Sequence, residues 1–201
     1  MSDQDPFVVG ATTIQVSDGN LLTQPVAAIM ISANNHLNGQ SSWAKDIRLA
    51  AGPRYEAECR RLVAATGARG FHQGTAVVTG GYQMARGNDR RWVIQAITIA
   101  YQDGHRVRAT PDIVYAATRA ALEKAEVFQV PSVAAYLMAA RYPDYATSPA
   151  IAMAEALCYA LLDHAMIAVT VRQIILCEHN QRGDDFDRVK TARDALQTVR
   201  S

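Results

Sequence analysis

Short apolar runs alternate along the chain with longer segments of helical periodicity. Residues 12–16 alternate apolar and polar positions, and residues 26–32 are almost continuously apolar, which is typical of a strand covered on both faces. Gly and Pro separate many of the segments, as at Gly52-Pro53 and Ser148-Pro149. Further strands are predicted over residues 75–79, 92–99, 127–133 and 169–177. Helices are predicted over residues 44–51, from 53 onward, 111–126, from 149 onward and 184–199.

This order of elements predicts an α/β fold, with a mostly parallel sheet between helical layers. In such sheets, ligands bind where loops leave the carboxyl ends of the strands. The function is therefore to be sought after residues 26–32, 127–133 and 169–177. The 201 residues show no internal repeat or low-complexity segment, and we expect one domain over residues 1–201.

Charge and composition exclude several classes of protein. With 20 Lys and Arg against 19 Asp and Glu, the net charge of +1 argues against a nucleic-acid binder of the strongly basic kind. The longest apolar stretch, residues 151–171, contains Glu155, Asp163 and His164, so it does not predict a membrane span. The polar N-terminus lacks a secretory signal, and we expect a cytoplasmic protein.

The cysteines and histidines do not predict a metal site or a disulfide framework. Cys59, Cys158 and Cys177 are widely spaced and lie within apolar patterns, so we expect buried free thiols. The five histidines lack the spacing of metal ligands. We therefore expect neither a metal nor another cofactor.

The strongest motif lies at the end of the second predicted strand. It reads V-A-A-I-M-I-S-A-N-N-H-L-N-G over residues 26–39, and I-R-L-A-A-G-P follows over residues 47–53. This pattern resembles the macro domain family, in which V-D-A-I-V-N-A-A-N is followed by L, a glycine-rich loop and A-I-x-x-A-A-G-P. The resemblance continues in residues 74–82, which match G-x-A-x-x-T-x-G-Y, and in the order of elements to the C-terminus.

The resemblance implies a three-layer α/β/α sandwich with a central mixed, mostly parallel sheet and a cleft for ADP-ribose. By position, Asn34 matches the asparagine that holds the ribose farther from the adenine, and Asn20 matches the aspartate that accepts from the adenine. Residues 39–42 match the first phosphate-side loop, and residues 134–139 match the second glycine-rich loop. The ligand-binding residues predicted in this way are Asn20, Leu21, Asn34, Gly39, Ser41, Ser42, Trp43, Ala135, Tyr136, Leu137, Met138 and His179.

The chain also departs from the family pattern at functional positions. Ala44 replaces the aspartate often assigned to water activation, so no catalytic residue is assigned. The first loop keeps one glycine, and the second reads A-A-Y-L-M-A where the family has a pattern such as S-T-G-I-F-G. Glycine suits a loop that wraps a diphosphate, because it adopts positive φ and places no Cβ in the path of the ligand.

Each candidate residue also has a structural interpretation. Asn34 either contacts a ligand or caps its own loop, and Asn20 either accepts from a base or shapes a turn. Trp43 and Tyr136 either stack on a ligand or plug the cleft. His36 lacks a carboxylate at a spacing that would orient it, and Asp46 lies two helical steps from Ala44, about 200° around the helix.

Three hypotheses for the function follow. The first is a module that binds ADP-ribose, a related nucleotide or an ADP-ribosylated protein, with weak or no catalysis. The second is an ADP-ribosyl hydrolase that orients water without the usual aspartate. The third is a degenerate macro domain with a structural or partner-binding function, for example as a homodimer. The segment 151–162 is apolar over a wide arc, which fits either a subunit interface or a deeply buried core helix.

Overall fold

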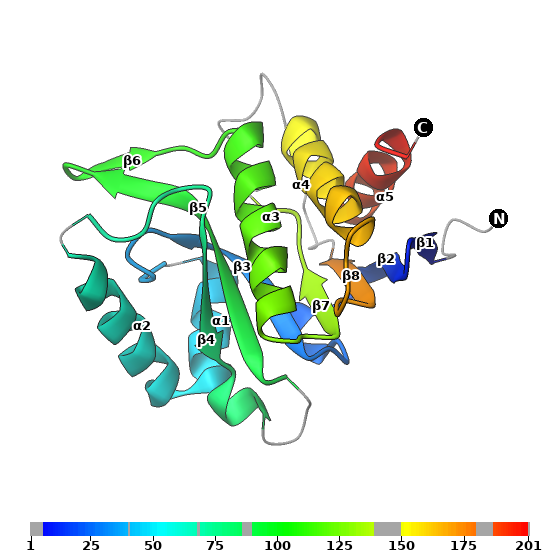
Figure 1. Ribbon diagram of the computed structural model, residues 1–201. Coiled ribbons are helices and arrows are strands. Elements are labelled where there is room, and N and C mark those ends of the chain that lie inside the picture. The colour runs from blue at the N-terminus through cyan, green and yellow to red at the C-terminus, as the bar shows by residue number, and fades with distance from the viewer. Residues whose placement is uncertain are drawn as a thin grey trace.

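A mixed, mostly parallel sheet lies between two layers of helices in the computed structural model of the protein (Figure 1). The structure describes residues 6–39, 41–67, 69–85, 90–138, 150–179 and 187–200, without the side chain of Ser42. The strands are β1 (Phe7–Val9), β2 (Thr12–Asp18), β3 (Ala28–Asn34), β4 (Ala76–Gly80), β5 (Trp92–Gln102), β6 (His105–Val107), β7 (Ser132–Ala135) and β8 (Gln173–Glu178). The helices are α1 (Ser42–Ala51), α2 (Pro53–Thr66), α3 (Pro111–Val127), α4 (Ala150–Ala165) and α5 (Arg188–Thr198), with short 3-10 turns at Leu21–Thr23 and Tyr82–Ala85.

The strands follow the order β1-β2-β8-β7-β3-β5-β4, and β6 pairs with β5. Strands β2, β8, β7, β3 and β5 are parallel to one another, whereas β1 and β4 pair antiparallel at the two edges. The carboxyl ends of five strands therefore meet at one edge of the sheet. This arrangement confirms the predicted α/β sandwich with a mixed, mostly parallel sheet.

Each face of the sheet carries its own apolar cluster. Helices α1 and α2 cover one face, where Ile29 and Ile31 of β3 contribute to the cluster. Helices α3, α4 and α5 cover the opposite face, which includes Met30 of the same strand. Because consecutive side chains of a strand point to opposite faces, burial on both sides explains the apolar run of β3.

The wide apolar arc of α4 is buried within the chain. This helix lies between α3 and α5 (Figure 1), and Met153, Leu157 and Ala160, which widen its apolar arc, are all buried. The core-helix interpretation therefore accounts for the apolar pattern of α4. Ile151 in the first turn is an exception, at 62% exposed.

Two strands begin later than the sequence pattern indicates. Strand β7 begins at Ser132, because α3 continues to Val127 and a turn with Gln129 at φ 54° follows it. Strand β8 begins at Gln173, four residues after the predicted start, and α5 begins at Arg188. The pattern missed β1 and β6, which have only three residues each. Ser148, Pro149 and Phe186, used in the prediction of helices, lie outside the described residues.

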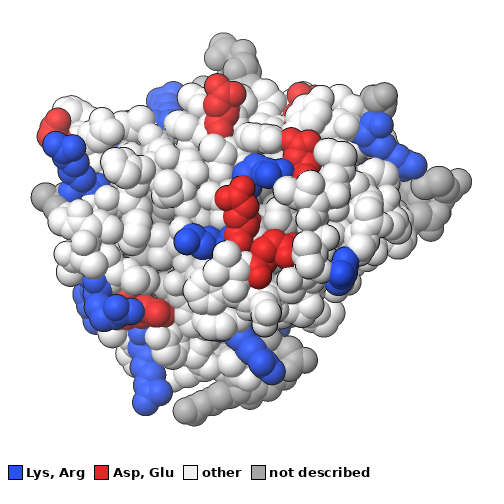
Figure 2. Space-filling model, viewed as in Figure 1, with Lys and Arg blue, Asp and Glu red and all other residues white. Residues whose placement is uncertain are grey.

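Charged side chains of both signs are interspersed on the face that carries α3 and α4, as Figure 2 shows. One pair on this face is Arg119 with Glu123, at an N–O distance of 3.8 Å. This distribution agrees with the balanced composition. In the part of the chain that the structure describes, no helix is long and apolar enough to cross a membrane.

Candidate functional site

The topology of the sheet changes direction between β3 and β7. Strand β3 pairs with β5 as far as Asn34, but its pairing with β7 ends at Ile29. The chain leaves β3 toward α1 and α2 on one face, and it leaves β7 toward α4 on the other. Such a switch point is where open α/β sheets bind ligands, so we take the carboxyl ends of β3 and β7 as the candidate site.

An aromatic side chain packs into this switch point. Tyr136 follows β7 directly and is only 7% exposed. The backbone N–H of Ser32 donates to its hydroxyl oxygen at 3.2 Å, beyond the end of the pairing between β3 and β7. The ring of Trp43 lies 6.0 Å from the ring of Tyr136, at an interplanar angle of 33°. Two predicted site residues are therefore brought together, and Tyr136 supplies an acceptor in place of a neighbouring strand.

Asn34 makes its hydrogen bonds within the loop that it begins. Its Oδ1 accepts from the N–H groups of His36 and Asn38, at 3.1 and 3.2 Å. Its Nδ2 donates to Oδ1 of Asn38 at 2.9 Å. The contacts of Asn34 thus correspond to the loop-capping interpretation, in a buried position at the edge of the candidate site.

Asn35, which the sequence analysis did not single out, clamps three segments together. It is 2% exposed, and its Nδ2 donates to the carbonyl oxygen of Arg69 at 2.9 Å. Its Oδ1 accepts from the N–H of Tyr101, also at 2.9 Å. Gly70 at φ +66° passes so close that a Cβ there would lie 2.2 Å from the carbonyl oxygen of Asn35. This clamp fixes the end of β3 against β5 and the loop before β4.

The first loop is tied to the beginning of α1. The Oγ of Ser41 caps this helix by accepting from the N–H of Ala44 at 3.3 Å. The guanidinium of Arg48 donates to the carbonyl oxygen of Gly39. Ser42 begins the helix, and Asp46 is exposed on it.

The loops after β2 and β8 lie side by side, because Asp18 and Glu178 are register partners. Asn20 shapes a turn, in which its Oδ1 accepts from the N–H of Leu22 at 2.7 Å, and Leu21 is fully buried. His179 lies 3.2 Å from Asp18, measured from Nδ1 to Oδ1, and both side chains are mostly exposed. The structure thus brings together the residues predicted for the adenine end.

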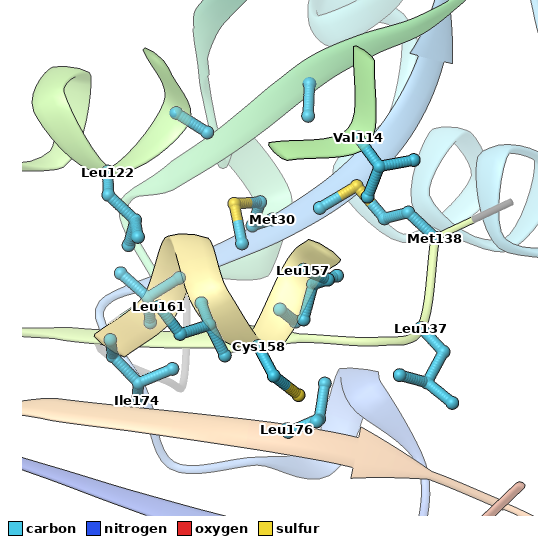
Figure 3. Packing of buried hydrophobic residues seen from close by; sticks show 14 of the residues in the cluster. Met30, Val114, Leu122, Leu137, Met138, Leu157, Cys158, Leu161, Ile174 and Leu176 are labelled. Atoms are coloured by element: carbon cyan, nitrogen blue, oxygen red, sulfur yellow. The ribbon is translucent and has the colours of Figure 1, made fainter. Parts of the chain in front are cut away.

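The second loop turns most of its side chains into the core. Ala135, Leu137 and Met138 belong to the cluster beneath α3 and α4, and Figure 3 shows Met138 beside Val114. Tyr136, like Ala134, belongs to the cluster on the face covered by α1 and α2. The predicted position Ala139 lies outside the described residues.

Glu178 is a site residue that the sequence analysis missed. It ends β8, is only 5% exposed, and accepts a hydrogen bond from the backbone N–H of Leu137 through Oε1. The available signal was a carboxylate that follows the apolar run 174–177 and directly precedes His179. Its position next to the second loop followed only from the pairing of β7 with β8.

The three thiols are free and buried, as predicted. Burial, and then nearby carboxylates, raise the pKa of Cys158 and of Cys177 to about 12, and burial also raises the pKa of Cys59. Such thiols stay protonated near neutral pH and are poor nucleophiles. No group of three or more His, Cys, Asp or Glu residues that could hold a metal occurs among the described residues.

Comparisons with known proteins place this geometry in a family. The Macro domain family model matches residues 31–154. A mutant macrodomain of Oceanobacillus iheyensis with ADPR has a similar fold, with a TM-score of 0.77, 16% identity and coverage of 98% of both chains. The Trypanosoma brucei macrodomain in complex with ADP gives a TM-score of 0.71 at 18% identity, covering 91% of this chain and 68% of that one. A search of the curated proteins finds no match. The family model spans more than half of the residues, and the protein therefore belongs to the macro domain family.

Proposed function

We propose that this protein binds ADP-ribose or a related nucleotide, free or attached to a protein, with weak or no catalysis. The observation that carries the proposal is that the carboxyl ends of β2, β8, β7 and β3 lie side by side at the switch-point edge of the sheet. Family membership supports it, since similar macrodomains have been solved with ADPR and with ADP. Asn20 and His179 would face the base, and Asn34 would lie toward the farther ribose.

The side chains near the first loop support the proposal that catalysis is weak or absent. Ala44 offers only a methyl group, and the neighbouring carboxylate of Asp46 is exposed. The Nε2 of His36 lies 3.4 Å from the amide nitrogen of Asn35, a neutral group that does not orient it as a carboxylate would. Because general-base assistance is typically worth about 10²–10⁴-fold in rate, a site without it should turn over slowly.

Titration calorimetry with ADP-ribose, AMP and NAD tests the proposal. We expect saturable binding, and we expect Tyr136→Gly to increase the affinity for ADP-ribose several-fold, because it removes a ring from the switch point. Tyr136→Phe is the matched control, since it keeps the ring and removes only the hydroxyl. Release of label from an ADP-ribosylated protein should stay near the uncatalysed rate.

A second candidate, a degenerate macro domain that no longer binds nucleotides, is favoured by the packing of Tyr136 against Trp43. It predicts flat titrations for the wild type and binding only after Tyr136→Gly. Flat titrations for the wild type would therefore remove the nucleotide-binding proposal, and flat titrations for Tyr136→Gly as well would show that the ring of Tyr136 is not what prevents binding.

A further inference from the structure

Four backbone donors around the switch point already donate to side chains of the chain itself. The N–H of Leu137 donates to Glu178, and the N–H of Ser32 donates to the hydroxyl of Tyr136. The N–H groups of His36 and Asn38 donate to Asn34. A loop that holds a phosphate needs such donors to point at the ligand.

Glu178 differs from the other acceptors because it carries a negative charge. Its carboxylate takes the N–H of Leu137, in the loop where a diphosphate would need donors. The neighbouring Cys177 is affected by this charge, since burial, and then Glu178, raise the pKa of its thiol to about 12. A phosphate at the second loop would have to compete with the carboxylate for the same donor and would also be repelled by it.

We propose that Glu178 is a specificity-determining residue that excludes phosphate from the second loop, so that the site prefers an uncharged nucleoside such as adenosine to a nucleoside diphosphate. This inference rests on the proposed function, because it concerns the same site, and it moves the preferred ligand from ADP-ribose to the nucleoside part of that ligand. The part of the site next to β2 and β8 is compatible with a nucleoside, because Asn20 and His179 are exposed there beside the buried Leu21.

The size of the effect follows from the position of the charge. Like charges a few ångströms apart repel one another several times more strongly at a protein surface than in bulk water. Glu178 is 5% exposed, so water screens it only partly. Since a factor of ten in affinity corresponds to about 1.4 kcal/mol, removing the charge should change phosphate binding about tenfold or more.

The test compares adenosine, AMP and ADP-ribose by titration calorimetry on three proteins. Wild type should bind adenosine most tightly and ADP-ribose most weakly. Glu178→Gln keeps an oxygen for the N–H of Leu137 but removes the charge, so affinity for ADP-ribose should rise about tenfold or more. Its affinity for adenosine should change by less than about twofold, because no phosphate is involved.

Glu58→Gln is the matched control. Glu58 also accepts a backbone N–H, from Gly80 at 2.9 Å, but this bond lies at the β4 edge of the sheet. The substitution changes the net charge equally and should leave all three affinities unchanged.

Different outcomes separate the two proposals. ADP-ribose binding more tightly than adenosine to wild type, or Glu178→Gln shifting all three ligands equally, would overturn the inference and leave the proposed function standing. If none of the ligands binds either protein, both fail. Should thermal melting show that Glu178→Gln is unfolded, the ranking of the ligands on wild type decides.

Discussion

Two carboxylates at opposite ends of β8 make the same kind of bond in different surroundings. Near the amino end, Glu126 accepts from the backbone N–H groups of Val169, Thr170 and Val171, at 3.2, 2.7 and 3.2 Å. At the carboxyl end, Glu178 accepts from the N–H of Leu137. In both places a side chain satisfies backbone donors that no strand partner reaches.

The two carboxylates differ in the other groups that the fold places near them. Glu126 is also 3.2 Å from Nε2 of the buried His164, and its contacts join α3, α4 and the segment before β8. Burial alone would raise the pKa of Glu126, but the N–H groups of Val171 and Thr170, together with His164, hold the pKa below its usual range. The contacts of Glu126 are those of a residue that stabilises the fold, whereas Glu178 lies next to the switch point, where a ligand would bind. The position in the topology, and not the bond itself, separates the two carboxylates.

The largest effect is expected from Glu126→Ala. Three backbone donors and His164 would lose their acceptor, and unsatisfied donors of this kind cost about 1–3 kcal/mol each when buried. Because water can reach part of the site, we expect the free energy of unfolding to fall by about 3–5 kcal/mol in urea denaturation. Glu123→Ala, at a carboxylate that is 62% exposed, should change it by less than about 0.5 kcal/mol. A loss below about 1 kcal/mol for Glu126→Ala would mean that the bonds of Glu126 are not structural.

A smaller contrast is expected between Asn35→Ala and Asn34→Ala. Asn35 joins separate segments in a fully buried position, so its loss should lower the free energy of unfolding by about 2–3 kcal/mol. Among the described residues, the side chain of Asn34 bonds within its own loop. We expect Asn34→Ala to lower the free energy of unfolding by about 1 kcal/mol and to weaken nucleotide binding. Denaturation and calorimetry on both variants measure the two effects. The reverse order of stability would show that the clamp of Asn35 is less important than its contacts indicate.

The smallest effect is expected in the dependence of stability on pH. Burial, only partly opposed by Glu126, holds the pKa of His164 below its ordinary value of 6.5. As the pH falls, the unfolded chain therefore protonates this histidine before the folded chain does. The contribution of neutral His164 to the free energy of unfolding is complete above pH 6.5 and is lost as the pH falls below that value. The slope cannot exceed about 1.4 kcal/mol per pH unit for one proton.

Denaturation between pH 7.5 and about 5 measures this slope. His164→Gln keeps a donor for Glu126 and should flatten the curve, whereas His105→Gln, at an exposed histidine, should not. Equal slopes for wild type and His164→Gln would contradict the assignment to His164.

Local pattern determined most of the architecture. Apolar runs of period two or with both faces buried indicated β2, β3, β4 and β5. Proline at the first turn indicated the start of α2 and of α3, and Gly52 with φ 81° separates α1 from α2 as the G-P pair predicted. Motif resemblance indicated the family. These signals are local because the periodicity of a helix or a strand can be recognised within a few neighbouring residues.

The long-range contacts of the candidate residues followed only from the tertiary structure. The hydroxyl of Tyr136 meets Ser32 across 104 residues of sequence, and Glu178 meets Leu137 across 41. Such contacts depend on the pairing of parallel strands that are distant in the chain, and a pattern of neighbouring residues does not say which of these strands lie side by side. For the same reason, a carboxylate that ends an apolar strand was visible in the sequence, but the donor that it satisfies was not.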